Sequence, residues 1–283
     1  MGDVAPSIAR DLPWIGVRDP WAVLVSEVML QQTQAARVIE PWRRFLETLP
    51  TVASCANAPR STVIELWGGL GYNRRAGYLH DAARAITDEF DGRIPKDPLA
   101  LRRLPGVGHY TANAVASFAF GVRVGVLDTN VGRILARAIA NRPLGRAEAQ
   151  RLADELLGRG DSAAHNQAML DLGAQFCTGT PRCATCPLAS RCAWRTNGGA
   201  DPARRSAAVS VPQGAFAGSN RQLRGRIVAT LREGPARLDV VVRRVAQPPQ
   251  RVAELLATLV ADGLVEHVAD AVRLVGDPRE LIE

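Results

Sequence analysis

The amino-acid sequence predicts a mainly α-helical protein that carries a small second domain at its C-terminal end. Apolar residues recur with helical spacing through successive segments of residues 20–175, and short runs containing Gly or Pro separate these segments. Alternating patterns that indicate strands are short, namely VRVGVLD in the helical region and VRLV close to the end. The main domain is therefore predicted to be helical.

The composition is that of a globular protein with a polyanionic partner. The 283 residues are 47% hydrophobic, which is enough to build real cores. No apolar run is long enough to cross a membrane and the first residues lack the pattern of a secretion signal, so we expect a cytoplasmic protein. The formal net charge of +7 points to a partner such as nucleic acid. Arginine supplies most of this charge, and its planar guanidinium suits phosphate oxygens.

The first predicted helix, within residues 21–34 (WAVLVSEVMLQQTQ), contains one carboxylate in an apolar run. Apolar residues surround Glu27 on every face, so no rotation of the helix places Glu27 in water while the others stay buried. A buried carboxylate is costly unless the protein uses it, because the charge loses its hydration. We therefore interpret Glu27 as a candidate catalytic acid with a raised pKa.

A tight turn is predicted between the next two helices. In PLALRRLPGVGHYTANAVASFAF, Pro105, Gly106 and Gly108 predict a turn with positive φ angles, which completes a helix-hairpin-helix. Such a turn exposes backbone N–H groups at a helix N-terminus, where they and the helix dipole favour a phosphate. Further on, VLDTNVGRILARA places Asp128 directly before another helix, where Asp commonly serves as the N-cap.

Four of the five cysteines lie close together in CTGTPRCATCPLASRC, with five, two and five residues between them. In a chain without a secretion signal, such a cluster favours a metal site over disulfides. Thiolate ligands at this spacing suit either tetrahedral zinc or a cubane iron–sulfur cluster, and both remain open. The predicted metal ligands are Cys177, Cys183, Cys186 and Cys192.

The C-terminal part of the chain predicts a separate small domain. Residues 196–218 mix Gly, Pro, Ser and Arg and are predicted to form a linker. Residues 219–283 predict three helices and a small hairpin, an order that resembles a winged helix-turn-helix. A DNA-reading module and a helical packing or partner-docking module both fit this pattern, because no base-reading residues stand out.

Together these motifs resemble the helix-hairpin-helix DNA glycosylase superfamily, and within it the adenine-specific MutY branch. The resemblance covers residues 10–194 and implies a helix-hairpin-helix DNA glycosylase fold over residues 1–195, with a [4Fe–4S] cluster loop at residues 177–192. One departure is visible, since the first cysteine interval is five residues rather than the family's usual six. The blocks that carry the resemblance are LPW, SEVMLQQTQ, GLGY, LPGVGHYTA, LDTNVGRILAR, NQAMLDLGA and CPLASRC.

The resemblance assigns catalytic roles to four residues. Cleavage of an N-glycosidic bond needs one group that protonates the departing base and another that stabilises the positively charged sugar. Glu27 is expected to protonate adenine N7, and Asp128, kept ionised by N–H donors, to stabilise the sugar cation. Asn130 is expected to hydrogen-bond near Asp128. Tyr110 stands where the endonuclease III branch has a lysine, so we expect base release without strand cleavage.

The resemblance also implies residues that contact DNA. Gln31 and Tyr72 match the positions that fill the gap left by an extruded base. Gln167 matches the position that reads the adenine edge with its amide. Arg10 is expected to shape the mouth of the base pocket. The hairpin glycines Gly106 and Gly108 are expected to lie against the DNA backbone.

These expectations combine into one function with two alternatives. The first is a monofunctional adenine DNA glycosylase of base excision repair, acting as a monomer on double-stranded DNA with a mismatch and associated with the bacterial nucleoid. The second is a thymine or uracil mismatch glycosylase on the same scaffold. The third is a non-catalytic DNA-binding regulator, against which the pair of carboxylates speaks. No Nudix-like pattern follows residue 215, so recognition of the opposite base falls to other parts of the chain.

Overall fold

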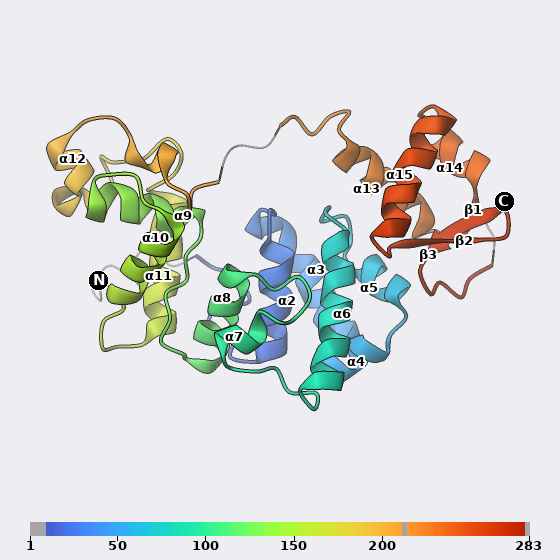
Figure 1. The fold of residues 1–283 in the computed structure, drawn as a ribbon, viewed down its shortest axis with the longest axis horizontal. Coiled ribbons are helices and arrows are strands. Elements are labelled where there is room, and N and C mark those ends of the chain that lie inside the picture. The colour runs from blue at the N-terminus through green and yellow to red at the C-terminus, as the bar shows by residue number, and fades with distance from the viewer. Residues whose placement is uncertain (1–9, 211–213, 281–283) are drawn as a thin grey trace. The chain divides into compact units, whose positions relative to one another are not determined.

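The computed structural model describes residues 10–210 and 214–280 and is mainly helical, as the sequence predicts (Figure 1). The chain forms two compact units, and each draws on separate stretches of the sequence. Unit 1 consists of residues 10–23, 96–102 and 108–210. Unit 2 consists of residues 24–95, 103–107 and 214–280.

Short polar side chains begin many of the helices, which explains where the helices start. The Asp19 carboxylate accepts hydrogen bonds from the backbone N–H groups of Trp21 and Ala22, at 2.7 and 3.1 Å. Thr51 and Ser54 cap the next region reciprocally, and such caps satisfy N–H groups that have no partner within the helix. The helices of the N-terminal half are α2 (Pro20–Leu30), α3 (Ala35–Thr48), α4 (Val52–Asn57), α5 (Arg60–Leu66), α6 (Arg74–Glu89), α7 (Pro98–Leu101) and α8 (His109–Phe120).

The core of unit 1 forms where two helices and a π-helical segment pack together. Val131 and Leu135 on one side meet Met169 and Leu172 on the other, and all four are buried. Burial of each such side chain contributes roughly 1.5–3 kcal/mol. The elements of this region are α9 (Thr129–Ile134), the π-helix η1 (Leu135–Ala140), α10 (Arg146–Glu155), α11 (Ser162–Gln175), the 3₁₀ turn η2 (Ala189–Arg191), α12 (Ala193–Asn197) and the 3₁₀ turn η3 (Pro202–Arg205).

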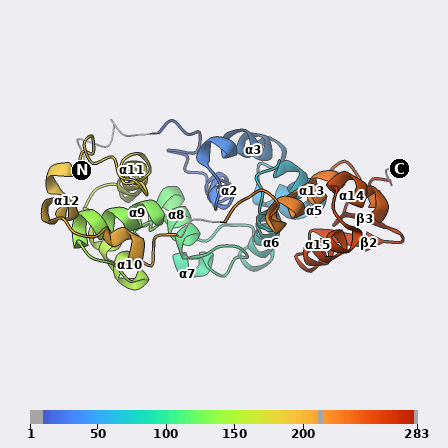
Figure 2. The same ribbon diagram turned by 90° about the horizontal axis from the view of Figure 1, so that it is seen from above.

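The C-terminal region has the order and sheet topology of a winged helix, which confirms the predicted three helices and hairpin. Its antiparallel sheet has the strand order β1-β3-β2, with Val265 opposite Leu274 and Ala236 opposite Val272. Figure 2 shows the helices gathered around these strands. The elements are α13 (Asn220–Leu231), β1 (Ala236–Arg237), α14 (Leu238–Val245), α15 (Pro249–Ala261), β2 (Val265–Val268) and β3 (Ala271–Leu274).

The winged region packs against α5 and α6 within unit 2. The Ser61 N–H donates to the Val275 carbonyl at 3.0 Å. Arg279 pairs with Glu65 at 2.5 Å, and Arg74 pairs with Asp262 at 3.2 Å. The winged region is therefore tied to the first helices by backbone and side-chain contacts.

Two local patterns differ from their sequence-based interpretation. The segment VRVGVLD, residues 122–128, forms no strand, and the Val124 N–H donates to the Val122 carbonyl at 3.0 Å within it. Part of the predicted linker packs onto unit 1, because Ala203 and Ser206 are buried and Asp201 pairs with Arg137 at 2.7 Å. Composition marked this segment as a linker because small and polar residues give no helical period, yet small residues also allow close packing.

No helix within residues 10–210 and 214–280 is both long enough and apolar enough to cross a membrane.

Candidate functional site

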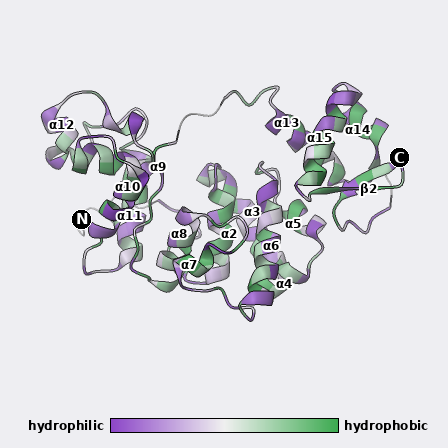
Figure 3. Cartoon of the chain, viewed as in Figure 1, coloured by the Kyte–Doolittle hydropathy of each residue, from purple (hydrophilic) through white to green (hydrophobic). Residues whose placement is uncertain are grey.

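Glu27 is buried in α2, as its apolar surroundings in the sequence predict. Glu27 is only 4% exposed, and its neighbours Leu24 and Val28 are buried as well. Figure 3 shows the hydrophobic character of α2 along its length. A carboxylate in such surroundings is poorly hydrated, so its burial is costly unless the protein uses it.

A buried arginine, Arg75 of α6, holds the end of α2. Its guanidinium donates to the carbonyls of Val28 and Met29 at 3.0 and 2.8 Å, and to Thr33 Oγ1 at 3.0 Å. These carbonyls belong to the last turn of α2, where carbonyl groups lack donors within the helix. Burial lowers the pKa of Arg75 to about 10, so the group stays charged at neutral pH. Sequence reasoning missed Arg75.

Arg75 also fixes the turn that carries Tyr72. It donates to the Gly71 carbonyl at 2.9 Å and lies 5.5 Å from the centre of the Tyr72 ring. Tyr72 has a φ of +49°, in the left-handed region that a side chain rarely adopts. On the tip of the ring, Arg221 donates to the Tyr72 hydroxyl at 2.6 Å. The backbone and the tip of Tyr72 are thus held by two different arginines.

The hairpin before α8 confirms one predicted glycine conformation and corrects another. Gly106 has a φ of +74°, and a Cβ at this position would lie 2.6 Å from Tyr78 Cβ, so only glycine fits. Gly108 has a φ of −87° with extended backbone, so the positive angle predicted there is wrong. Gly108 serves instead as the N-cap of α8, a position that glycine tolerates. Gln31 Nε2 donates to the Gly106 carbonyl at 3.3 Å.

Asp128 in unit 1 caps α9 and accepts several hydrogen bonds. Its carboxylate accepts from the Val131 N–H at 2.8 Å and from Asn130 Nδ2 at 2.6 Å. Burial nevertheless raises the pKa of Asp128, and these donors and the nearby Arg133 only partly offset that effect. This direction is opposite to the expectation that the donors alone would keep Asp128 fully ionised.

A short series of hydrogen bonds connects Asp128 to the cysteine loop. Asn130 donates to Asp128 and accepts from Arg133, and Arg133 also donates to the Cys177 carbonyl. Gly173 of α11 permits this arrangement, because a Cβ there would lie 2.7 Å from Asn130 Cβ and 2.8 Å from its carbonyl oxygen. Asn130 is therefore placed beside Asp128, as the resemblance implies.

Gln167, Arg10 and Tyr110 lie in unit 1 as well. Asp171, which is 1% exposed, accepts from Gln167 Nε2 at 2.8 Å and from Arg10 Nε at 2.6 Å. Tyr110 of α8 is half-buried and packs against the core of the unit. Sequence reasoning missed Asp171, although it stands four residues after Gln167 and so on the same helix face.

The four clustered cysteines line one cavity. All are unoxidised, and Ile134, Leu188 and Trp194 complete the apolar part of its wall. Arg137 donates to Cys177 Sγ at 3.5 Å, and Cys192 Sγ donates to the Arg137 carbonyl at 3.8 Å. In the described part of the chain, no three His, Cys, Asp or Glu residues are arranged to hold a single metal ion. The donor set of four thiols around a shared cavity suits a group that thiolates bind.

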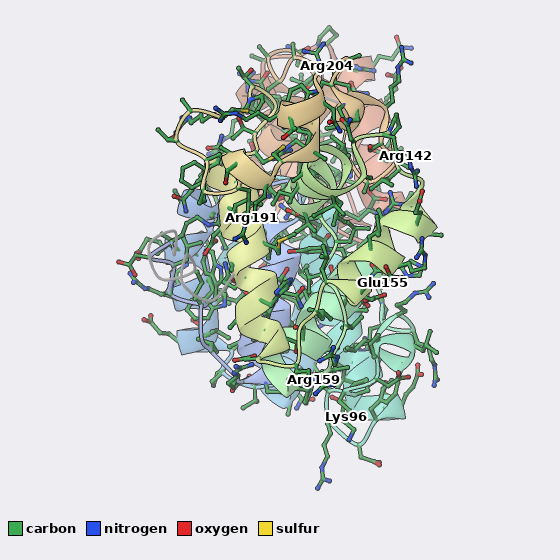
Figure 4. The ribbon with its side chains drawn as sticks, turned by 90° about the vertical axis from the view of Figure 1, so that its left-hand side faces the viewer. Lys96, Arg142, Glu155, Arg159, Arg191 and Arg204 are labelled. Carbon is green, nitrogen blue, oxygen red and sulfur yellow. The ribbon has the colours of Figure 1, made fainter. Side chains whose placement is uncertain are left out.

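The surface near this cavity is basic. Arg182, Arg191 and Arg195 of the cysteine loop and its following helix are exposed. Figure 4 shows Arg191 on this side of unit 1, together with Arg204 of η3 and with Arg142 and Arg159 in the connections before and after α10. Arginines spread over such a face can meet the phosphates of a nucleic acid.

Comparison with known sequences places this geometry in context. The family model described as HhH-GPD superfamily base excision DNA repair protein matches residues 25–159. The adenine DNA glycosylase of Mycolicibacterium smegmatis is 41% identical over 274 residues, which cover 92% of this chain and 89% of the relative. The adenine DNA glycosylase of Mycobacterium tuberculosis is 43% identical over 277 residues, which cover 92% of this chain and 87% of the relative. Coverage of this extent includes most of the winged region.

Comparison with solved structures agrees with the helical fold. A thermostable thymine-DNA glycosylase matches with a TM-score of 0.61 and 28% identity, over 66% of this chain and 89% of that chain. The match is thus to a similar domain and leaves about a third of this chain outside it.

Proposed function

The chain belongs to the adenine DNA glycosylases of the HhH-GPD superfamily of base excision DNA repair proteins, and from this premise we propose that it hydrolyses the N-glycosidic bond of adenine mispaired with 8-oxoguanine or guanine. The observation that carries the proposal is the similarity to two mycobacterial adenine DNA glycosylases over 92% of the chain. The buried carboxylate Glu27 supports it, because a structural helix has no need of one.

Glu27 is the proposed general acid. The adenine ring gains electrons as the bond to the sugar breaks, and a proton delivered to N7 neutralises them. The burial of Glu27 among apolar side chains supports this role, because it keeps bulk water away from the carboxyl. After it donates the proton, Glu27 can accept one from water and so help the water attack the sugar.

Asp128 is the proposed partner that stabilises the sugar. Its negative charge is opposite in sign to the oxocarbenium ion that develops, and so would stabilise it. Hydrogen bonds from Asn130 and the Val131 N–H orient the carboxylate. The raised pKa of Asp128 fits a carboxylate whose charge is poorly solvated and therefore acts strongly on a nearby cation.

Tyr110 is proposed to make the enzyme monofunctional. A phenol is a weak nucleophile at neutral pH and cannot form the Schiff base that a lysine forms with the opened sugar. Release of adenine without cleavage of the strand is the expected outcome. Tyr110 then contributes to the shape of the site through its packing on the unit 1 core.

The DNA is proposed to contact both units. An extruded adenine must be replaced in the duplex, and the ring of Tyr72 with the amide of Gln31 suits that role. Gln167 has an amide that matches the donor and acceptor pattern of adenine, and Asp171 orients it together with Arg10. The hairpin at Gly106 and Gly108 is proposed to bind backbone phosphates of the same duplex through its N–H groups.

Cys177, Cys183, Cys186 and Cys192 are proposed to hold a [4Fe–4S] cluster. The four thiols surround one cavity, and the Arg137 guanidinium donates to one of them, which supports an anionic thiolate group there. When bound, the cluster would brace the loop that carries Arg182, Arg191 and Arg195. We assign it no redox step in turnover.

The proposed enzyme acts as a monomer on mismatched double-stranded DNA in the bacterial nucleoid. The test is base release from duplexes with adenine opposite 8-oxoguanine or guanine, and with thymine opposite guanine, followed by alkaline treatment of half of each sample. Adenine release with strand breaks only after alkali is the expected result. Release of thymine in place of adenine would favour the mismatch thymine glycosylase, and release of no base would favour a DNA-binding regulator.

A further inference from the structure

Aromatic rings and guanidinium groups alternate along one side of unit 2. Arg221 lies 5.1 Å from the centre of the Phe216 ring and 5.4 Å from that of Tyr72. Arg75 lies 5.5 Å from the Tyr72 ring and 5.2 Å from the Trp67 ring. Each such pair is attractive because the ring face is electronegative. The order is Phe216, Arg221, Tyr72, Arg75 and Trp67, from the exposed end to the buried one.

Two parts of the chain thus meet at Tyr72. Arg75 and Trp67 come from the first helices, whereas Arg221 comes from α13 of the winged region and Phe216 from the segment just before it. Arg221 also donates to the Tyr72 hydroxyl at 2.6 Å, which restricts rotation of the ring about its own bonds. The turn fixes the Tyr72 backbone, and the hydrogen bond from Arg221 restrains the side-chain torsions that aim the ring.

The rest of the winged region is poorly suited to reading DNA. The exposed residues of α15, the helix that would enter a groove, are mostly apolar or acidic, and Gln250 and Thr258 are the polar exceptions. Residues 219–283 contain ten arginines and nine acidic residues, and most of the arginines are engaged within unit 2. The ion pairs are Arg224 with Asp262, Arg237 with Asp239 and Asp270, Arg243 with Asp239, Arg244 with Glu233, Arg251 with Glu254, Arg273 with Glu266, and Arg279 with Asp277 and Glu65.

We infer that Arg221 is a positioning residue for Tyr72, and that the winged region acts on the mispair through this side chain rather than through a recognition helix. The inference rests on the proposed function, in which Tyr72 enters the duplex. A ring that enters a stack of bases must be held at one angle, and Arg221 holds it from the tip. Phe216 packs on the other side of Arg221 and keeps the guanidinium in place.

The test compares Arg221→Ala with Arg226→Ala in the full chain. Arg226 lies on the same helix α13 and is exposed, so its replacement removes the same charge without touching Tyr72. The measurements are the single-turnover rate of adenine release from a duplex with adenine opposite 8-oxoguanine, and the affinity for a fully paired duplex. Thermal unfolding of each variant checks the fold.

Arg221→Ala is expected to slow adenine release by about tenfold and to change the affinity for paired DNA less than about twofold. Arg226→Ala is expected to match the wild type in rate. A fluorescent adenine analogue next to the mispair reports on stacking, and its signal should change with Arg221→Ala alone. Equal rates for the two variants would overturn the inference, whereas a wild type that releases no adenine would overturn the proposed function instead.

Tyr72→Phe gives a second test that leaves the winged region intact. It removes only the hydroxyl that Arg221 contacts and keeps the ring. Arg221→Ala should therefore cost less in the Tyr72→Phe background than in the wild type, because residues that act together are not additive. Arg221→Lys should restore part of the rate, since it keeps a donor but loses the planar group. The same loss in both backgrounds would mean that Arg221 acts elsewhere and would contradict the inference.

Discussion

Each of the two compact units carries one of the proposed catalytic carboxylates and one arginine that supports it. The two arginines differ in the parts of the protein to which they donate hydrogen bonds. In unit 2, Arg75 binds carbonyls at the end of the helix that carries Glu27 and in the turn of Tyr72. In unit 1, Arg133 binds Asn130 beside Asp128 and then the carbonyl of Cys177. The helix that carries Glu27 is therefore held by hydrogen bonds from a neighbouring helix, whereas the hydrogen bonds that hold Asp128 continue to the proposed cluster loop.

This difference has a practical consequence. Loss of the proposed cluster should disturb Asp128 and leave the arrangement around Glu27 nearly unchanged. Substitution of Arg75 should disturb the arrangement around Glu27 and leave Asp128 nearly unchanged. Variants in each unit therefore test this difference.

The largest effect is expected at Glu27. Glu27→Gln keeps the shape of the side chain but removes the transferable proton, so the rate of adenine release should fall by about 10³-fold or more, within the range that general acid catalysis spans. Binding of mismatched DNA should remain nearly intact, as measured by fluorescence anisotropy. Glu47→Gln on the exposed side of α3 is the control. A normal rate for Glu27→Gln would refute its catalytic role.

Cys186→Ser should break the support of Asp128. We choose Cys186 because Cys177 itself belongs to the hydrogen-bonded series, so any effect of Cys186 on Asp128 must pass through the loop. The rate should fall by about 10²-fold, within the range seen when a group that orients catalytic residues is lost. Hydrogen exchange should rise in residues 128–140 and stay unchanged in residues 24–48. Cys55→Ala, a thiol in unit 2, is the control; equal exchange changes in both stretches would contradict the comparison.

The pH dependence should reveal Asp128. Burial raises its pKa, so protonation removes the needed charge at a pH above that of an ordinary aspartate, and the rate should fall about tenfold per pH unit below this pKa. The linked effect on stability has the opposite sign. Above the raised pKa the buried charge destabilises the folded state. This destabilisation decreases as the pH falls from the pKa of the folded state to the pKa of the unfolded chain.

Asp128→Asn checks this linkage independently of activity. Asn retains the N-cap role, so the variant should unfold at a higher temperature than the wild type at neutral pH. The gain should shrink in acidic buffer. A variant that is less stable at neutral pH would show that the hydrogen bonds of Asp128 outweigh the cost of its burial.

The smallest effect on rate is expected at Arg75. Arg75→Lys keeps the charge but reaches fewer carbonyls, which should lower the free energy of unfolding by about 2 kcal/mol. Adenine release should slow only a few-fold, because the core of unit 2 still holds α2. Arg84→Lys, exposed on the same helix, is the matched control in urea unfolding. If both variants unfold alike, Arg75 does not stabilise the end of α2.

The sequence predicted the elements that depend on local pattern. The helical period, the winged order of the C-terminal region and the burial of Glu27 follow from residue spacing, and the structure confirms them. The angle at Gly108 was wrong because a glycine signals conformational freedom without saying which conformation is used. The direction of the Asp128 pKa was missed because burial depends on residues far along the chain.

The supporting residues were harder to find because their partners are backbone carbonyls, which carry no sequence signal. Arg75 donates to residues more than forty positions away. One hint was present, since Arg75 shares a helix face with the buried residues Leu79 and Ile86. A charged residue on an apolar helix face, such as Arg75, indicates a buried polar contact. Asp171 gave a similar hint within a largely apolar helix.

At Gly173, α9 and α11 lie too close together for even a methyl group to fit between them. Most base changes at the first or second position of a glycine codon replace the glycine by a residue with a side chain, which would push against Asn130 and move Asp128. A single base change in this codon would therefore disturb the proposed catalytic carboxylate of unit 1 from a neighbouring helix.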